Sequence, residues 1–385
     1  MRKFIVLIVF VAVAFWAFKN DFFFSPEADD TSGPTEVEAT GSVSPSPDGV
    51  DSIVQPTDSL AEEIDLLRKQ VSKEDDDGTR LQLVHALLDH GDREMRSDGI
   101  GILRAVFRSG SDFSPVAAAL LLKEDDGADL EVARYIVERG PDAAGYEQAC
   151  FSLGSVAAAN PEEESQLEAW KLLSAAYFGR EEMKWRNEIR PQLDAIVGKW
   201  ILSARSSSFS TMITVQPGDS LSKIARQNKV TVGSLEQLNG LRSDVIHPGQ
   251  LLKALPGKYR IEVDKSDFRL DLILDDRFLR SFRIGHGRDG CTPIGEFVVN
   301  IRQKKPAWQP RDRAPVQYGD PENPLGERWL GFKPTPQYSG YGIHGTVKSE
   351  TIGTESSDGC VRLTDKDVIQ LYPWVPPGTQ VVVRE

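Results

Sequence analysis

The hydrophobic pattern changes along the chain, and this change constrains the fold more than any other feature. Between residues 59 and 205 apolar residues recur at helical spacing, whereas from Tyr259 onward they fall in short β-type runs. At 385 residues the chain is also too long for one ordinary core. The sequence therefore predicts a multidomain protein, with an all-α region at 59–205, a small unit at 211–256 and a mainly-β domain at 259–385.

The N-terminus has the pattern of an export segment. Two positive charges, Arg2 and Lys3, precede an apolar run from Phe4 to Phe18, and acidic sequence follows. Ala12-Val13-Ala14 offers a small-residue cleavage site, but the bulky aromatic residues after it favour a membrane anchor at residues 1–24 over a cleaved signal peptide. Residues 25–58 are rich in Pro, Ser, Thr and acid with few large apolar residues, which predicts a disordered tether.

The region 59–205 has the pattern of successive short helices. In the clearest of them, Asn160 is expected to cap the helix and Pro161 to take its first position, before the helix stops at Gly179. Its apolar face consists of Leu167, Trp170, Leu173 and Tyr177. Further helices are predicted at 59–73, 79–90, 97–108, 113–123, 144–158 and 181–203, and one ending before Gly140. Such an array fits a partner-binding scaffold and a plain spacer equally well, and Cys150 is expected in its core.

The charge of the chain argues against nucleic-acid binding, and the spacing of its histidines and cysteines argues against a zinc site. The net charge is -13, and the first 210 residues carry 37 acidic against 21 basic side chains. No segment has the basic excess of a nucleic-acid-binding protein. The five histidines show no paired-ligand spacing, so a zinc site is not expected, and three cysteines do not form a disulfide framework.

The segment Ile213–Leu255 predicts a compact β-α-α-β unit. A strand at 213–215 is followed by two capped helices, the second ending at Asn239-Gly240, and by a closing strand at 251–255. The segment resembles a LysM module through Pro217-Gly218-Asp219-Ser220-Leu221, Ile224-Ala225, Leu238-Asn239-Gly240 and Pro248-Gly249-Gln250. The resemblance implies binding of N-acetylglucosamine-containing glycans, in this case peptidoglycan. The candidate glycan contacts are Gly218, Asp219, Ser220, Ile246 and His247.

Short β-type runs fill the C-terminal part of the chain. They lie at 259–263, 268–274, 278–284, 295–301 and 381–383, and Asp275-Asp276 separates two of them as a hairpin turn would. We expect a mainly antiparallel sheet with long loops. The segment from Gln303 to Pro336, rich in Pro, Gly and charge, is interpreted as a lid or a substrate-binding insertion.

One histidine and one cysteine near the end of this part suggest a nucleophile and its base. Cys360 follows His344 by sixteen positions, and a thiol needs a neighbour such as imidazole to become a good nucleophile. Taken alone, the pair fits a buried structural cysteine and histidine at least as well. Residues 259–385, however, resemble the catalytic domain of L,D-transpeptidases of the YkuD type. The matching motifs are Thr292-Pro293-Ile294-Gly295-Glu296-Phe297, Asn323-Pro324-Leu325-Gly326, Arg328-Trp329-Leu330, Gly342-Ile343-His344-Gly345-Thr346, Ile352-Gly353, 357–363 and Pro377-Gly378-Thr379.

This resemblance implies a cysteine transferase that acts on peptidoglycan stems without a metal or organic cofactor. Cys360 would attack the carbonyl between the third residue and the terminal D-alanine, and His344 would act as base. Main-chain N–H groups at Asp358, Gly359 and Cys360, beside Ser357, match the family's oxyanion site. Arg362 would bind a substrate carboxylate or pin the loop to an acid. Further substrate-binding candidates are Tyr341, Trp329 and Gly345.

Two residues leave alternatives open. The family usually has histidine where this chain has Asp358. The Asp358 carboxylate would oppose formation of the Cys360 thiolate unless it pairs with Arg362 or points away. Alternatively, Asp358 would help to orient His344. Cys291 is expected to be free and structural; the alternative is a disulfide with Cys360 that silences the nucleophile. His286 and His247 are weaker candidates for the base.

The sequence therefore predicts an exported cell-envelope protein, anchored to the cytoplasmic membrane, that cross-links peptidoglycan stems or attaches them to a protein. An L,D-carboxypeptidase that uses water as acceptor is one alternative. A catalytically inactive wall-binding protein is the other. A protein partner for the helical region is the remaining expected interaction.

Overall fold

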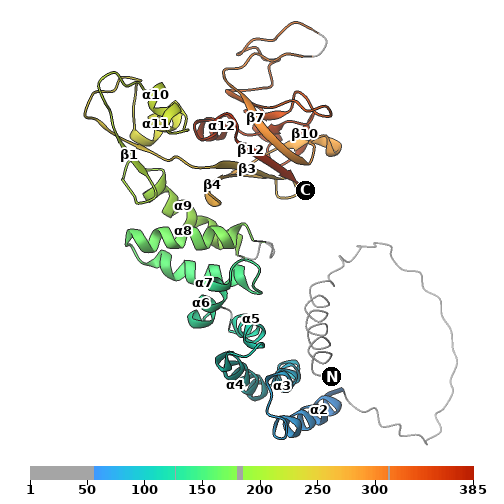
Figure 1. Cartoon of the computed structure of the whole chain (residues 1–385). Coiled ribbons are helices and arrows are strands. Elements are labelled where there is room, and N and C mark those ends of the chain that lie inside the picture. The colour runs from blue at the N-terminus through green and yellow to red at the C-terminus, as the bar shows by residue number, and fades with distance from the viewer. Residues whose placement is uncertain (1–55, 126, 180–184, 311–312) are drawn as a thin grey trace, which may run out of the picture. The chain divides into compact units, whose positions relative to one another are not determined.

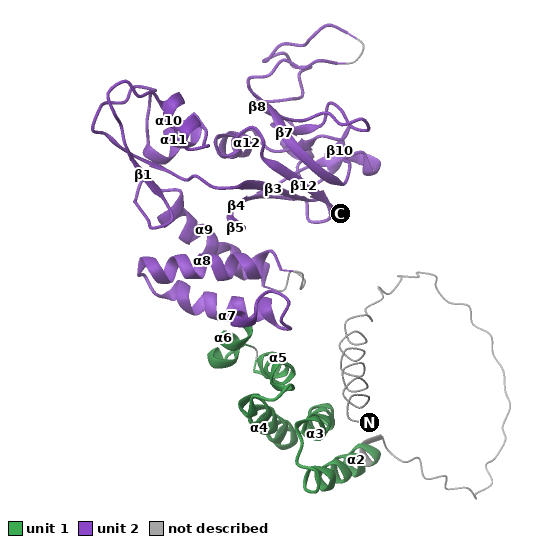
Figure 2. Ribbon diagram, in the orientation of Figure 1, with its two compact units in different colours: residues 1–136 green, residues 137–385 purple. Residues whose placement is uncertain are grey.

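The computed structural model describes residues 56–125, 127–179, 185–310 and 313–385 (Figure 1). The chain forms two compact units, residues 1–136 and 137–385, which are treated separately (Figure 2). The predicted membrane anchor and nearly all of the predicted tether lie outside the described residues. None of the helices within the described ranges is long and apolar enough to span a membrane.

In the residues that the structure describes, the first unit consists of helices and the turns between them. Each helix buries leucine, isoleucine, valine or alanine side chains. Aspartates cap three of the helices: Asp76 accepts from the Thr79 N–H at 3.1 Å, Asp92 from the Glu94 N–H at 2.8 Å and Asp129 from the Glu131 N–H at 3.1 Å. The helices confirm the predicted all-α pattern. They are α2 (Pro56–Val71), α3 (Asp77–Asp89), α4 (Arg93–Ser109), α5 (Ser114–Glu124) and α6 (Leu130–Arg139), the last crossing the boundary between the units.

The second unit begins with further helices that also match the prediction. They are α7 (Tyr146–Ala159), α8 (Glu163–Tyr177), α9 (Arg186–Ile196) and a π-helical turn, η1 (Val197–Ile201). The predicted start of α8 was wrong. The helix begins at Glu163, and Pro161 lies before it in a turn where the Asn160 side chain accepts from the Glu162 N–H at 3.0 Å. Cys150 is fully buried, as predicted.

A small β-α-α-β unit follows, as predicted for the LysM-like segment. Strands β1 (Thr211–Thr214) and β2 (Leu251–Ala254) pair antiparallel and enclose α10 (Leu221–Gln227) and α11 (Val232–Asn239). Ser220 caps the first helix and Thr231 the second, while Gly240 ends the second in the left-handed conformation that glycine adopts readily.

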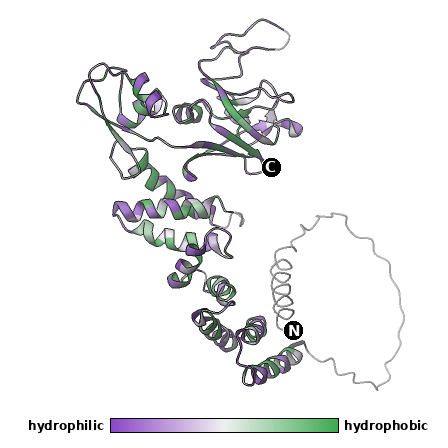
Figure 3. Ribbon diagram, viewed as in Figure 1, coloured by the Kyte–Doolittle hydropathy of each residue, from purple (hydrophilic) through white to green (hydrophobic). Residues whose placement is uncertain are grey.

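Eight strands form the main sheet, in the order β11-β9-β8-β7-β12-β3-β4-β5. Five of the neighbouring pairs are antiparallel, while β12–β3 and β11–β9 are parallel, so the predicted mainly-β fold is correct. Hydrophobic residues concentrate along its strands (Figure 3). The strands are β3 (Tyr259–Asp264), β4 (Arg269–Leu274), β5 (Arg277–Arg283), β7 (Gly295–Lys304), β8 (Arg328–Phe332), β9 (Gly342–His344), β11 (Val361–Arg362) and β12 (Gln380–Arg384).

The remaining elements of this domain are short. A separate parallel pair joins β6 (His286–Gly287) to β10 (Glu355–Ser357), and α12 (Asp365–Leu371) continues into the turn η4 (Tyr372–Trp374). Two further single-turn helices are η2 (Arg288–Gly290) and η3 (Ser349–Thr351). The segment 303–336 is not one continuous loop, because β7 extends to Lys304 and β8 lies inside the segment.

Helix α8 packs directly on the open edge of this sheet. The Trp170 indole N–H donates to the Phe278 carbonyl at 2.6 Å, and Ser174 Oγ accepts from the Phe278 N–H at 3.0 Å. Because β5 is an edge strand, its outward backbone groups need partners, and these side chains supply them. The helices of residues 137–205 therefore share a core with the β domain.

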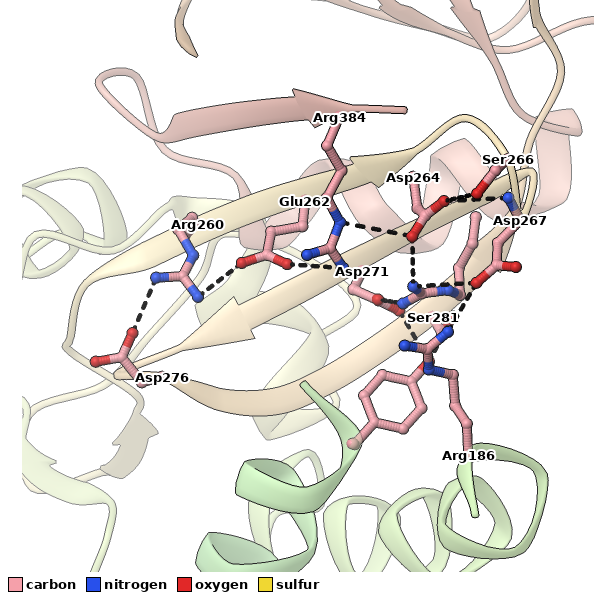
Figure 4. Close-up of polar contacts among 12 residues, drawn as sticks. Arg186, Arg260, Glu262, Asp264, Ser266, Asp267, Asp271, Asp276, Ser281 and Arg384 are labelled. Atoms are coloured by element: carbon pink, nitrogen blue, oxygen red, sulfur yellow. Dashed lines mark hydrogen bonds and ion pairs between the residues drawn. The ribbon is translucent and has the colours of Figure 1, made fainter. Parts of the chain in front are cut away.

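Ion pairs reinforce this contact (Figure 4). Arg186 of α9 pairs with Asp267 at 2.7 Å, and Arg269 pairs with Asp271 and, at 3.1 Å, with Asp264. The Tyr177 hydroxyl donates to Asp271 at 3.2 Å. These charges are mostly buried, so each depends on its partners to remain stable.

Lys253 on β2 ties the helices to the small β-α-α-β unit. Its side chain is fully buried, and its ammonium group donates to the carbonyl oxygens of Trp200, Ile201, Ser203 and Arg205 at 2.6–3.0 Å. Burial lowers the pKa of Lys253 to about 8. The cation thus satisfies carbonyl groups that the end of a helix leaves without partners.

Candidate active site

Strands β9 and β11 place the predicted nucleophile and base on one face of the sheet. They run parallel, with Arg362 level with His344 and Val361 level with Ile343. Side chains alternate along a strand, so Cys360, Arg362 and His344 point to the same side. Cys360 lies one strand over and two positions back from His344, which is a Cα separation of roughly 8 Å that the two side chains can bridge.

A set of buried hydroxyl groups holds the loop that presents Cys360. Ser357 Oγ donates to the Cys360 carbonyl at 2.7 Å and accepts from the Gly359 N–H at 3.1 Å. Thr292 Oγ1 donates to the Gly359 carbonyl at 2.9 Å and accepts from the Gly287 N–H at 2.7 Å. The loop is therefore fixed from both sides before any substrate arrives.

Gly359 is required at its position for two reasons. Its φ of +121° is one that residues with a side chain rarely adopt. A Cβ there would also lie 2.5 Å from the Tyr341 ring and 2.8 Å from the Cys291 carbonyl oxygen. Tyr341 consequently packs against the backbone next to the nucleophile.

The Cys360 thiol is partly exposed, and its surroundings favour the neutral form. Its Sγ lies 3.7 Å from the Gly340 carbonyl oxygen. Burial raises the pKa of Cys360 to about 11, although the Gly342 N–H and the Arg362 guanidinium favour the thiolate. The resting group is a thiol rather than a preformed thiolate.

His344 is buried and neutral. It is 3% exposed, and its Nδ1 lies 2.5 Å from the Gly345 carbonyl oxygen. A carbonyl only accepts hydrogen bonds, so Nδ1 carries the proton and Nε2 carries the lone pair. Burial, helped slightly by the charge of Arg362, lowers the pKa of His344 to about 4, while the hydrogen bond with the Gly345 carbonyl opposes the shift.

Arg362 offers hydrogen-bond donors beside this pair. Its Nε is buried without a hydrogen-bond partner among the described residues, and the side-chain hydrogen bond it does form there is a long one, 3.5 Å from Nη1 to Ser356 Oγ. Asp358 does not pair with Arg362. It is exposed and forms an ion pair with Arg288 instead, and its charge makes a small contribution that raises the pKa of the Cys360 thiol.

The other predicted residues of this site either lie beside His344 or contribute main-chain N–H groups beside Cys360. The Trp329 ring lies 5.9 Å from the His344 ring and covers Gly342, so it lines the same face. Gly345 packs against Asp365 and supplies the carbonyl that orients His344. The Gly359 N–H is bonded to Ser357, whereas within the described residues those of Asp358 and Cys360 have no assigned partner and remain open to an oxyanion.

The predicted glycan-binding residues lie on two adjoining loops of the β-α-α-β unit. Val215 and Gln250 join these loops through a backbone hydrogen bond of 2.9 Å. Asp219 is bonded to the Gln216 N–H and to Lys223, and Ser220 caps α10. Gly218 has a positive φ, Ile246 packs against the core of the unit, and His247 is exposed.

The remaining cysteine and histidine candidates lie nearby. Cys291 is free and exposed. The ring of His286 is buried, stacks on Phe268 and faces two carbonyl oxygens, so it is already engaged. In the described part of the chain, no group of three or more His, Cys, Asp or Glu side chains is placed to hold a metal ion.

Sequence reasoning missed two residues of this site. Thr292 was noted only as part of a motif, yet its hydroxyl group holds the Gly359 carbonyl across 67 positions of sequence. Arg288 was not singled out, although it neutralises Asp358. No local pattern identifies either partner, because both contacts depend on the pairing of β6 with β10.

Comparisons with known proteins agree with this geometry. The family model of the YkuD L,D-transpeptidase catalytic domain matches residues 258–383, and that of the LysM domain matches residues 213–254. YqjB of Bacillus subtilis, named as an L,D-transpeptidase, is 36% identical over 134 residues, which are 34% of this chain and 74% of that protein. YkuD of Bacillus licheniformis, which carries the same description, is 34% identical over 181 residues, 45% of this chain and 98% of that protein.

Solved structures of the same description also match. An L,D-transpeptidase of Xylanimonas cellulosilytica is 20% identical with a TM-score of 0.27, over 33% of this chain and 61% of that chain. Helical segments before residue 211 lie outside both family models. On the strength of the sequence relatives, the chain belongs to the YkuD family of L,D-transpeptidases and carries a LysM domain in front of its catalytic domain.

Proposed function

We propose that this protein is a peptidoglycan L,D-transpeptidase whose catalytic residues are Cys360 and His344. The observation that carries the proposal is the shared face of β9 and β11, where a thiol, a neutral imidazole and a guanidinium with a free donor lie together. The substrate is a stem tetrapeptide, and the bond attacked joins its third residue, a diamino acid, to the terminal D-alanine.

The first half-reaction forms a thioester. Cys360 Sγ attacks the carbonyl carbon while its proton passes to His344 Nε2, and the N–H groups of Asp358 and Cys360 donate to the developing oxyanion. The carbon–nitrogen bond then breaks as His344 returns the proton to the leaving amine. D-Alanine departs, and the shortened stem remains on the sulfur.

The second half-reaction transfers the acyl group to an amine. His344 accepts a proton from the acceptor amine as its nitrogen attacks the thioester carbonyl, and the released thiolate takes that proton back. The acceptor is the side-chain amine of a second stem, which gives a 3-3 cross-link, or an amine on a protein.

The protonation states of the resting pair fit this sequence of steps. A thiol with a raised pKa and an imidazole with a lowered pKa remain neutral, so the proton moves only when the carbonyl is in place. Until the substrate carbonyl is in place, the protonated thiol reacts only slowly with electrophiles in solution. This arrangement protects a partly exposed cysteine in an envelope enzyme.

Arg362 and Asp358 have different parts in this proposal. The free donors of Arg362 bind a carboxylate of the donor stem, which is the first of the two roles considered for it. Asp358 does not contact the base, because Arg288 holds its carboxylate at the surface, and its charge is only the smallest of the contributions to the pKa of the Cys360 thiol, which it raises. Replacement of the family's histidine by Asp358 is thus compatible with activity.

The LysM domain is proposed to hold the enzyme on glycan strands through the loops around Gly218–Ser220 and Ile246–His247. Such a protein works on the wall side of the envelope. The apolar run Phe4–Phe18 would deliver it there and anchor it to the cytoplasmic membrane.

The test is incubation of the purified protein with tetrapeptide-containing muropeptides and analysis of the products by mass. Cross-linked dimers support the proposal, whereas tripeptide alone identifies an L,D-carboxypeptidase. Intact binding without any product identifies an inactive wall-binding protein. Cys360→Ala must abolish every product.

A further inference from the structure

A cavity of about 660 Å³ lies between the LysM domain and the catalytic domain. One wall comes from α11 and the turns before and after it, with Val232 and Leu241, and the other from β7, β8 and η4. This volume falls in the range of about 300–1,000 Å³ that is usual for ligand pockets. None of the proposed catalytic residues lines it.

The two walls are fixed relative to each other. The Thr231 hydroxyl donates to the Pro373 carbonyl oxygen, and a Cβ at Gly233 would already touch Pro373 at 3.4 Å. Leu238 and Leu255 pack in the same core as the catalytic domain. The cavity is therefore a preformed site rather than a gap between independent domains.

Its charged residues are mainly cationic. Arg302, Lys304 and Arg328 line it, against the single acid Glu236. Arg302 is held by a 2.7 Å bond to the Tyr372 carbonyl and stacks on the Tyr372 ring at 4.2 Å, yet its buried Nε has no partner among the described residues. The structure likewise gives Lys304, an exposed side chain, no ion-pair partner in the parts of the chain it describes.

The site opens away from the catalytic face. Lys304 pairs with Arg328 across β7 and β8, while Gln303 pairs with Trp329 and Trp329 with His344. Because side chains alternate, Arg302, Lys304 and Arg328 lie on the face opposite to Trp329 and His344. A ligand bound there is not the stem that Cys360 attacks.

We propose that this cavity binds a second peptidoglycan stem peptide through its free carboxylates. Guanidinium and ammonium groups bind carboxylates, and the apolar walls formed by Val232, Leu241 and Pro377 suit alanine side chains and the aliphatic part of a diamino acid. A phosphate polymer would satisfy the cations but would leave these walls without contacts. The inference rests on the proposed function only for the choice of peptidoglycan as the ligand.

The experiment measures equilibrium binding of a dye-labelled, carbohydrate-free stem tetrapeptide to the full chain carrying Cys360→Ala, at low salt. Lys304→Glu is expected to weaken binding about fivefold, and Glu236→Gln to tighten it about twofold, because both act on a carboxylate ligand through charge. Lys258→Glu makes the same change of charge at an exposed position outside the cavity and is expected to change nothing. Arg362→Gln reports the share of binding at the catalytic face.

Equal effects of Lys304→Glu and Lys258→Glu would overturn the inference. So would displacement of the labelled peptide by poly(glycerol phosphate) at lower concentration than by unlabelled peptide. If Arg362→Gln removes all binding and Lys304→Glu none, the second site is refuted while the proposed function stands. If Lys304→Glu weakens binding and Arg362→Gln does not, the cavity is supported and the proposed role of Arg362 fails.

Discussion

Thr292→Val removes the hydroxyl group that holds the nucleophile loop and leaves the shape of the side chain almost unchanged. Thr292 is 2% exposed, and its Oγ1 makes two hydrogen bonds, from the Gly287 N–H at 2.7 Å and to the Gly359 carbonyl at 2.9 Å. Valine leaves both backbone groups without a partner in a closely packed place, where a Cβ at Gly287 would lie only 2.9 Å from Gly359.

The expected effect follows from these contacts. Each buried polar group left without a partner costs about 1–3 kcal/mol, so the loss of two partners should lower the free energy of unfolding by about 2–6 kcal/mol. Freeing the Gly359 carbonyl also lets Cys360 shift, and a displacement of about 1 Å at a reacting atom lowers the rate roughly 100-fold. The loss should appear in kcat rather than in KM, because neither bond touches the substrate.

The assay combines chemical denaturation with steady-state release of D-alanine. Thr292→Ser keeps the hydroxyl group and serves as the matched control, with near wild-type kcat and a smaller loss of stability. If Thr292→Val keeps wild-type kcat and stability, the hydroxyl group does not position the nucleophile, and the account of the loop is wrong.

Three further predictions concern protonation, charge and packing. The pKa of His344 is lowered to about 4, so the acid limb of kcat/KM should fall near pH 4 instead of near 6.5, and a limb near 6.5 would contradict a buried neutral base. Because the folded form of His344 resists protonation, its contribution to stability, about 3 kcal/mol, is present above pH 6.5 and lost as pH falls toward 4; His344→Gln should flatten that part of the denaturation profile. Asp358→Asn should leave the rate within about twofold of wild type, since it breaks only an exposed pair with Arg288, and a larger change in the pH–rate profile would restore a role in orienting His344. Ser174→Ala should lower the free energy of unfolding by about 1–3 kcal/mol by leaving the Phe278 N–H unpaired; Ser203→Ala, at a half-buried serine just beyond η1 whose hydroxyl donates to the Lys199 carbonyl, is the control with the smaller expected loss.

Local patterns were enough to predict most elements of the fold. Helical spacing identified α8 through Leu167, Trp170 and Tyr177, and the turn at Asp275-Asp276 separated β4 from β5, where both aspartates do have positive φ. Strands β9 and β11 escaped prediction. With three and two residues they are too short to show alternation, and their pairing depends on segments far apart in sequence.

Tertiary contacts decided what the sequence left open. The apolar face of α8 predicted a buried helix but not its partner, and the bond from Trp170 to Phe278 joins residues 108 positions apart. Lys253 would be expected at the surface from its residue type, yet it is buried among four carbonyl groups. The roles of Asp358 and Arg362 likewise depended on which of them has a partner, and only the structure shows that Arg288 takes Asp358.

The central claim is that Cys360 forms a thioester with the donor stem. Its most direct test is to incubate the protein briefly with a tetrapeptide stem and stop the reaction with acid. The mass of the intact protein is then measured, and peptide mapping locates any adduct. The account predicts an adduct equal to the stem less D-alanine, located on Cys360 and absent from Cys360→Ala. Product formation with no adduct on Cys360, or an adduct that persists in Cys360→Ala, would contradict it.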